Sequence, residues 1–223
     1  MKNIKALTLA FLLTLFGSSQ SLAEYGFTVG ITGSMAMIEA SGQETEGGEV
    51  SRGEVSNNVG VASFFVEYND ILGSGISLGV DYIPGSADVS SSISQRTDAN
   101  SEGDSATNKA QAEIDGHTTY YATYGVGDGA YLKVGYVEAD LNTLETLGTG
   151  SKYGNETVNG WELGAGVEFD AYMGSVGRLE LTHIDYGDIE IRSSVARAGV
   201  ATNNLIEADL DVTRLSASLG YKF

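Results

Sequence analysis

Apolar and polar residues alternate with a period of two along most of the chain after residue 24. Such alternation is typical of β-strands whose two faces meet different surroundings. The pattern recurs in eight runs, at 25–37, 62–68, 76–82, 118–124, 130–136, 161–169, 178–182 and 214–223. It is weaker in 118–124, and beyond Thr182 the apolar Ile184 and Tyr186 fall on polar positions. We therefore predict an all-β protein with eight antiparallel strands.

The segments between these runs alternate in length. The short ones are rich in Gly and Asp, as tight turns are, and cover 69–75, 125–129 and 170–177. The long ones are polar and cover roughly 38–58, 84–113, 139–158 and 187–209. Short turns at one rim and long loops at the other are typical of an up-and-down transmembrane β-barrel with periplasmic turns and extracellular loops. Because the number of strands is even, the N-terminus and the C-terminus of the barrel both lie at the short-turn rim.

Alternation alone leaves open whether the apolar face points into a soluble, ligand-binding barrel or outward to lipid. Charged residues among Gly and Ser at the polar positions favour an outward apolar face. The predicted inward charges are Glu67, Asp81, Lys133, Glu162, Glu168, Arg178, Glu180, Arg214 and Lys222. Aromatic residues near the strand ends also favour a membrane, because their rings prefer the headgroup layer. The predicted girdles contain Tyr25, Phe27, Tyr68, Tyr82, Tyr124, Tyr136, Trp161 and Phe169.

The inward charges predict a closed interior. Eight strands enclose a space that is only wide enough for side chains. Opposite charges in that space should pair, because an unpaired buried charge is costly. We predict a plug of salt bridges, and the alternative is a narrow ion pathway lined by the same charges.

The first residues predict a secretory signal peptide. A basic start, Met1–Lys5, precedes the apolar run Ala6–Phe16 and a small, polar segment that ends at Ala23. The apolar run is shorter than the ~20 residues that a transmembrane helix needs. We expect residues 1–23 to be removed and residues 24–223 to form the barrel.

The last strand, with Leu215, Leu219, Tyr221 and the final Phe223, resembles the C-terminal insertion signal of bacterial outer-membrane β-barrels. Residues 177–188 also resemble the penultimate strand of small OmpA/OmpX-type and opacity-like barrels. The resemblance implies a bacterial outer membrane, contact with lipid and lipopolysaccharide, and insertion by periplasmic chaperones and the barrel-assembly machinery. We expect no peptidoglycan-binding domain of the kind that follows the barrel in OmpA-type proteins.

Composition narrows the possible functions. The 223 residues carry a net charge of −18, which argues against nucleic acid as a partner. The absence of Cys excludes disulfides, thiolate metal sites and a Cys nucleophile. No cofactor or metal motif is present. We expect the acidic side chains of the long loops to be solvated. The alternative is that divalent cations bridge their carboxylates to lipopolysaccharide phosphates.

Few residues could carry catalysis. His183 and Asp185 share one face near the predicted outer rim and could form a general base. We favour a structural interpretation of this pair and predict that the protein is not an enzyme. His117, at the start of a strand, is a weaker candidate. The sequence Gly125–Gly129 superficially resembles a phosphate-binding loop, but it opens no helix, and a tight turn explains it better.

The predicted function is therefore structural or surface-interacting. Alternation at 87–93 and 189–195 predicts two hairpins that project above the membrane. Projecting strand edges can accept a strand of a partner, which would make an extracellular ligand possible. The alternatives are a narrow porin-like channel and an enzyme that uses His183 and Asp185.

Overall fold

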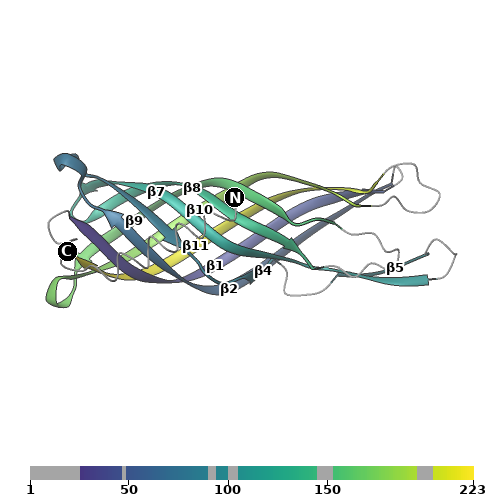
Figure 1. Ribbon diagram of the computed structural model, residues 1–223, viewed down its shortest axis with the longest axis horizontal. Coiled ribbons are helices and arrows are strands. Elements are labelled where there is room, and N and C mark those ends of the chain that lie inside the picture. The colour runs from purple at the N-terminus through teal and green to yellow at the C-terminus, as the bar shows by residue number, and fades with distance from the viewer. Residues whose placement is uncertain (1–25, 47–48, 90–93, 100–104, 145–152, 195–202) are drawn as a thin grey trace.

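The chain folds into a closed antiparallel β-barrel (Figure 1). The computed structural model describes residues 26–46, 49–89, 94–99, 105–144, 153–194 and 203–223. Within these residues, eight strands follow one another in the order β3–β2–β1–β11–β10–β9–β8–β7, and pairing of β3 with β7 closes the ring. The prediction of an eight-stranded all-β barrel is confirmed.

The ring strands are β1 (Phe27–Glu46), β2 (Glu49–Tyr68), β3 (Ile76–Tyr82), β7 (Ala112–Gly127), β8 (Ala130–Thr143), β9 (Glu156–Asp170), β10 (Ser175–Arg192) and β11 (Leu205–Lys222). A short strand, β4 (Ala87–Asp88), pairs with β7, while β5 (Ser94–Ala99) and β6 (Ser105–Ala110) form a separate two-stranded sheet. Two 3-10 turns, η1 (Ile71–Gly73) and η2 (Tyr172–Gly174), lie between ring strands. Among the described residues, no helix is both long and apolar enough to cross a membrane.

Three tight connections gather at one end of the barrel, together with the C-terminus (Figure 1). At this short-turn rim the Phe223 amide donates to the Phe27 carbonyl oxygen at 2.9 Å, which joins the last strand to the first. The β7–β8 turn needs glycine, because Gly129 has φ +77° and a Cβ there would lie 2.2 Å from the Glu168 carbonyl oxygen. The segment 125–129 is therefore a strand end and a tight turn.

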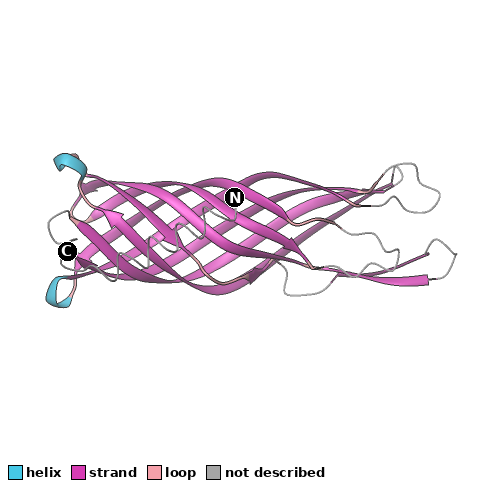
Figure 2. Cartoon of the chain, in the orientation of Figure 1, coloured by secondary structure: helices cyan, strands magenta, loops and turns pink. Residues whose placement is uncertain are grey.

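The strands run further from this rim than the alternation predicts (Figure 2). The predicted loop boundaries at 38–58 are wrong, because β1 reaches Glu46 and β2 starts at Glu49, with pairs such as Ser41 and Glu54 along the way. The predicted loop at 187–209 is shortened in the same way by β10 and β11. Backbone pairing does not require lipid, so the wall continues as a β-sheet where its outer side chains become polar.

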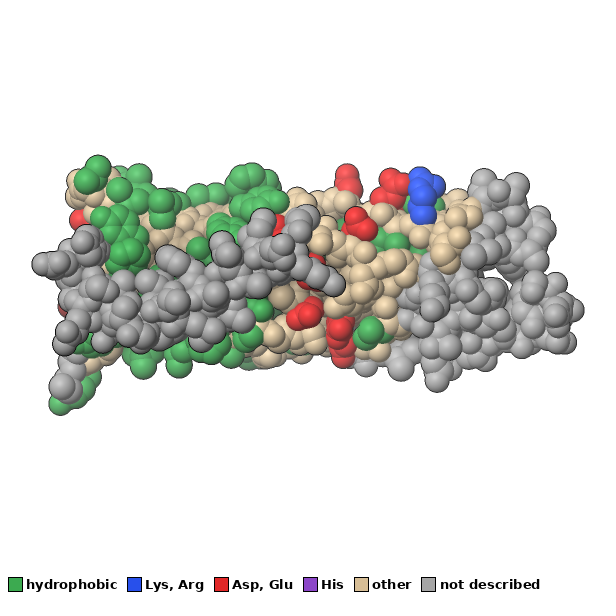
Figure 3. All heavy atoms as spheres, viewed as in Figure 1, with side chains coloured by type: hydrophobic (Ala, Val, Ile, Leu, Met, Phe, Trp, Pro, Cys, Tyr) green, Lys and Arg blue, Asp and Glu red, His purple; other side chains and the backbone are tan. Residues whose placement is uncertain are grey.

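The outer face is apolar near the short-turn rim and polar beyond it (Figure 3). Its exposed apolar side chains form what we name the lipid belt: Ile31, Met35, Phe64, Leu78, Leu132, Val134, Leu163, Val167, Leu179, Leu181, Leu215 and Leu219. On β9 the belt extends from Trp161 to Phe169, which fits the ~9–11 residues that a tilted strand needs to cross a bilayer. Farther along, outward positions carry Glu39, Asn58, Asp185 and other polar residues.

The polarity of the inner face changes along the barrel axis in the opposite direction to that of the outer face. At the level of the lipid belt most inward side chains are charged or hydroxylated, with Phe65 and Val176 as buried apolar exceptions, and Glu67 and Glu162 are almost completely buried. Beyond the belt the inward residues are apolar and form what we name the upper core: Ala36, Ile38, Val89, Ile114, Val137, Ala139, Leu141, Val158, Ile184, Tyr186, Ile189, Ile191, Leu210 and Val212. Where water replaces lipid outside, the hydrophobic effect favours burial of apolar side chains inside.

The upper core explains the break in alternation on β10. Ile184 and Tyr186 keep the inward phase and are buried, with Ile184 only 1% exposed. A bulge between Asp185 and Asp188, where Gly187 has φ +68°, then shifts the register by one residue. The shift leaves Ile189 and Ile191 facing the upper core.

A charge on the lipid belt should destabilise the barrel far more than one beyond it. Leu181 pairs with Ala165, midway between Trp161 and Phe169 on β9. We expect Leu181→Arg to lower the free energy of unfolding in phospholipid vesicles by about 2–4 kcal/mol, as for cations at a bilayer midplane. Urea titration followed by tryptophan fluorescence measures the loss. The control is Asp209→Arg, outward but beyond the belt, and an equal loss in both variants would contradict the belt.

Candidate functional site

The charged side chains inside the lipid belt form two clusters. In the first cluster, Arg178 on β10 donates to both Glu67 oxygens, from Nη1 at 2.8 Å and from Nη2 at 2.6 Å. Its Nε also donates to Glu168 Oε2 at 2.8 Å, and Lys222 Nζ reaches Glu168 Oε1 at 2.5 Å. Two cations therefore face two carboxylates in the first cluster, with a bidentate pair at its centre.

The second cluster lies around Glu162 on β9. Lys133 Nζ is 2.9 Å from Glu162 Oε1 and 2.9 Å from Glu180 Oε1. Arg214 lies 3.5 Å from both Glu162 Oε2 and Asp81 Oδ1. All nine predicted inward charges thus occur in the two clusters, and in the second the carboxylates outnumber the cations.

Aromatic side chains on polar positions connect the clusters. Tyr131 donates through its hydroxyl to Glu180 Oε2 at 3.0 Å, and its ring centre lies 5.8 Å from the Arg178 guanidinium carbon. Lys133 Nζ lies 4.5 Å from the centre of the Tyr121 ring. Tyr121 fits because a Cβ at Gly79 would lie 2.3 Å from its ring. Tyr121 and Tyr131 are not among the residues predicted from the sequence, although their aromatic side chains at inward positions are visible in it.

Polar groups lie where the second cluster meets the upper core. His117 is buried, and its ring packs edge-on against Tyr186 with 6.2 Å between ring centres. Arg214 Nε, the Thr182 hydroxyl and His117 Nδ1 are buried and have no hydrogen-bond partner among the residues that the structure describes. No carboxylate or nucleophile forms a hydrogen bond to His117 among the described residues, which leaves it without the partners of a general base.

In the part of the chain that the structure describes, the other candidate pair, His183 and Asp185, has separate hydrogen-bond partners. His183 Nδ1 lies 3.2 Å from Thr213 Oγ1, and its Nε2 lies 3.5 Å from Asp211 Oδ1 on the neighbouring strand. Asp185 instead accepts a hydrogen bond from the Gly187 amide at 2.8 Å and so stabilises the bulge. Both side chains lie on the outer face, where the His183 side chain is 57% exposed.

The predicted aromatic girdles lie on the outer face at both limits of the belt. Tyr136 and Trp161 pack edge-on with ring centres 5.7 Å apart at the limit far from the short-turn rim, where Tyr82 also lies. Phe27 and Tyr68, with ring centres 5.1 Å apart, mark the other limit. Tyr124, Phe169 and Tyr221 are exposed at this limit, and Tyr221 packs against Phe223. Leu219 and Leu215 are exposed farther along the last strand, with Leu215 near the middle of the belt. Tyr25 and the predicted signal peptide 1–23 lie outside the described residues.

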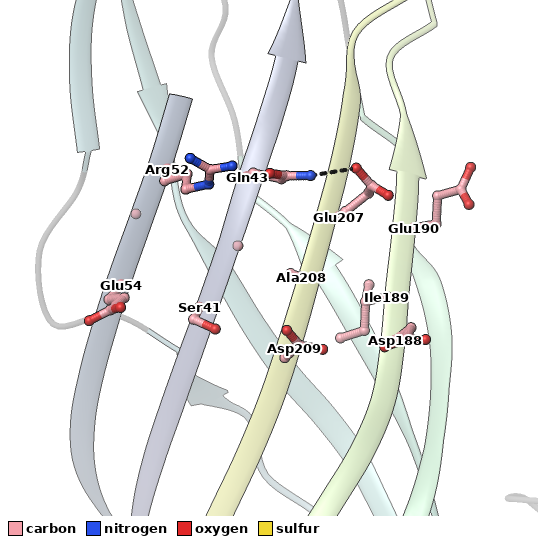
Figure 4. Close-up of a pocket in the computed structure, with 12 residues that line it drawn as sticks. Ser41, Gln43, Arg52, Glu54, Asp188, Ile189, Glu190, Glu207, Ala208 and Asp209 are labelled. Atoms are coloured by element: carbon pink, nitrogen blue, oxygen red, sulfur yellow. Dashed lines mark hydrogen bonds between the residues drawn. The ribbon is translucent and has the colours of Figure 1, made fainter. Parts of the chain in front are cut away.

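Beyond the belt, an open groove crosses the outer side of β2, β1, β11 and β10 (Figure 4). Two rows of outward side chains line it: Arg52, Gln43, Glu207 and Glu190 in one, and Glu54, Ser41, Asp209 and Asp188 in the other. Gln43 Nε2 donates to Glu207 Oε2 at 2.9 Å. In the described part of the chain, no group of His, Asp and Glu is arranged to hold a metal ion.

Comparisons with known proteins identify the fold. No protein-family model matches the chain, and no curated protein sequence matches it. The outer membrane protein OprG from Pseudomonas aeruginosa is 14% identical, with 89% of this chain and 96% of that chain covered and a TM-score of 0.53. The outer membrane protease OmpT from Escherichia coli is 12% identical, with 89% and 97% covered and a TM-score of 0.47. Ail, the attachment invasion locus protein of Yersinia pestis, is 11% identical, with 87% and 99% covered and a TM-score of 0.38.

The likeness to OprG shows the fold, which is that of a bacterial outer-membrane β-barrel. Together with the lipid belt, this fold places the protein in a bacterial outer membrane, as the sequence predicts. In such barrels the short turns are periplasmic and the opposite rim is extracellular. The groove and the upper core therefore lie on the extracellular side.

Removing one member of the first cluster should leave a buried charge without its partner. We expect Arg178→Met to lower the free energy of unfolding by about 3–5 kcal/mol, because Glu67 then stays buried and unpaired. Adding Glu67→Gln should recover part of the loss. The control is Lys222→Met, since its partner Glu168 keeps Arg178. Urea unfolding in vesicles measures all three, and an Arg178→Met loss no larger than that of Lys222→Met would contradict the pairing.

Proposed function

We propose that this protein is a closed outer-membrane barrel that interacts with other surfaces through its extracellular wall. The observation that carries this proposal is the filling of the interior by two stacked layers of different chemistry. The ion-pair clusters occupy the membrane level, and the buried apolar side chains of the upper core lie above them.

Each layer opposes the passage of ions by a different physical effect. An ion at the level of the first cluster would have to separate Arg178 from Glu67, which leaves buried charges unpaired. An ion that passed this level would next have to lose its hydration shell and lie among apolar side chains such as Ile184 and Leu210, which is costly for a charge. The interior therefore supports a plug and not a pathway.

The extracellular wall supports a role in surface interaction. Its strands stay paired well beyond the lipid belt, so its outward side chains are held on a sheet and not on separate loops. The groove residues Glu54, Asp188 and Asp209 are exposed on this sheet. A rigid surface loses little conformational entropy when it binds, which favours recognition.

A narrow channel remains the second candidate. The second cluster has more carboxylates (Asp81, Glu162, Glu180) than cations (Lys133, Arg214), which favours a cation over an anion in any leak. An enzymatic role is a weaker proposal. His183 contacts Thr213 and Asp211, while Asp185 is engaged with the Gly187 amide, so the two supply no general-base pair.

We further propose the partners that the resemblance implies. The lipid belt supports contact with membrane lipid, and the acidic outer face would meet lipopolysaccharide at the extracellular limit of the belt. Insertion by periplasmic chaperones and the barrel-assembly machinery stays a prediction, as does the extracellular ligand.

Conductance tests the proposal directly. We expect the refolded protein to give no discrete current steps in a planar bilayer. The double variant Lys133→Ala/Glu162→Ala should also stay silent, because the upper core still closes the barrel above the missing ion pair. Heat-modifiable electrophoretic mobility checks that each protein is folded. Regular single-channel steps from the unmodified barrel would overturn the proposal in favour of the channel.

A further inference from the structure

The barrel wall is incomplete on one side of β2. β3 ends at Tyr82, which pairs with Phe64, whereas β2 extends farther from the short-turn rim, as far as Glu49. Within the described residues, β2 therefore has β1 on one side between 50 and 62 and no paired strand on the other. This stretch lies beyond the lipid belt, where the outward residues of β2 are polar or small apart from Val50.

The segment that follows β3 pairs with β7 and lies beside β2 as far as Asn57, so that within the described residues the open stretch of this side of β2 is 50–56. The Ile83 amide donates to the His117 carbonyl oxygen at 2.9 Å, and β4 pairs with β7 farther along. A side-chain hydrogen bond from Asn57 Nδ2 to the Asp88 carbonyl oxygen, 2.9 Å long, links β2 to this segment. The β5–β6 hairpin pairs only with itself in the described part of the chain and lies apart from β2 in Figure 1.

An open strand edge presents backbone N–H and C=O groups that can pair with another strand. Proteins commonly protect such edges with proline, with β-bulges or with charged side chains, lysine above all. The stretch 50–62 contains no proline, and its charges, Arg52 and Glu54, have opposite signs on either side of Gly53. Both side chains are exposed and form no hydrogen bond or ion pair within the described residues.

We infer that this edge of β2 pairs with the same edge of a second copy of the protein, antiparallel and centred on Gly53. The inference rests on the proposed function, because it names the surface that the extracellular wall binds. In this arrangement Arg52 of each copy lies directly opposite Glu54 of the other. The interface is isologous, so one charge pair is formed twice.

Side-chain alternation limits the possible registers. Ser63, Phe65 and Glu67 point inward on β2, so even-numbered residues such as Arg52 and Glu54 point outward, as Figure 4 shows for the groove. In a continuous antiparallel sheet, outward positions must meet outward positions.

The charges then choose among the allowed registers. A pairing centred on Arg52 would place two guanidinium groups opposite each other, and one centred on Glu54 would place two carboxylates together. Like charges directly opposite are destabilising, whereas opposite charges stabilise the pair. The register centred on Gly53 avoids both repulsions.

Antiparallel pairing also fixes how the two molecules are oriented. The two-fold axis is perpendicular to β2, so the two barrel axes point in opposite directions. Copies in one membrane share the same direction and cannot form this pair. The interface therefore joins barrels in two facing membranes and would hold neighbouring cells together. The net charge of −18 opposes close approach, but about 0.15 M salt screens charges farther apart than ~8 Å.

Vesicle clustering tests the inference. The refolded protein is placed in phosphatidylcholine vesicles at about 0.15 M salt, and clustering is followed by light scattering. We expect protein-containing vesicles to cluster with one another and not to capture protein-free vesicles. Equal capture of protein-free vesicles would identify a lipid contact and overturn the inference.

Charge reversal tests the register. Arg52→Glu and Glu54→Arg should each abolish clustering, because every cross-copy pair then becomes a pair of like charges. The double variant Arg52→Glu/Glu54→Arg should restore it. Vesicles with Arg52→Glu should also cluster with vesicles that contain Glu54→Arg. Clustering by either single variant alone, or failure of the mixture, would overturn the register.

The matched control is Glu190→Arg, which makes the same charge change in the groove on β10, away from the open edge. It should cluster like the unmodified protein, and its loss of clustering would mean that overall groove charge is responsible, which overturns the inference. Electrophoretic mobility before and after heating verifies folding. Absence of clustering by a folded, non-conducting barrel overturns this inference alone, whereas current steps in a planar bilayer overturn the proposed function.

Discussion

The surroundings of the barrel change along its axis while its strands stay continuous, and the rest of the structure depends on this constraint. Near the periplasmic turns, an outward side chain meets lipid, so Leu163 is exposed there and Glu162 is buried beside it. On the extracellular side an outward side chain meets water, so Asp185 faces out and Ile184 faces in. One backbone arrangement satisfies its own hydrogen bonds through both media.

This change of surroundings accounts for the two layers inside the barrel. Charges that are excluded from lipid gather at the membrane level, where burial is tolerated only because Arg178, Lys133 and their carboxylate partners pair closely. Beyond the membrane there is no lipid for apolar side chains, and they fill the interior instead. The same division gives the proposed function its basis, since it closes the barrel and leaves a polar wall to the outside.

Sequence alternation predicted the strand count, the outward belt and every residue of the two ion-pair clusters, because side-chain direction follows directly from a period of two. The prediction failed beyond the lipid belt, where the apolar side chains lie on the inner face of the barrel and not on the outer one. In the sequence Ile184 and Tyr186 break the pattern, but they keep the inward phase. Residues 38–58 lack clear alternation and are predicted as loop, but β1 and β2 continue through most of them. The contact between His183 and Asp211 could not be predicted, because it depends on the register between two strands, and neither could the open edge of β2.

Fluorescence quenching measures most directly whether apolar side chains face lipid at the level of the membrane and face the barrel interior beyond it. In a Trp161→Phe background, Leu163→Trp and Tyr186→Trp each provide one tryptophan, on the lipid belt and in the upper core. Brominated acyl chains should quench the Leu163→Trp variant, whereas neither brominated lipid nor aqueous iodide should quench the Tyr186→Trp variant strongly. Strong iodide quenching of Tyr186→Trp, or no lipid quenching of Leu163→Trp, would contradict the account.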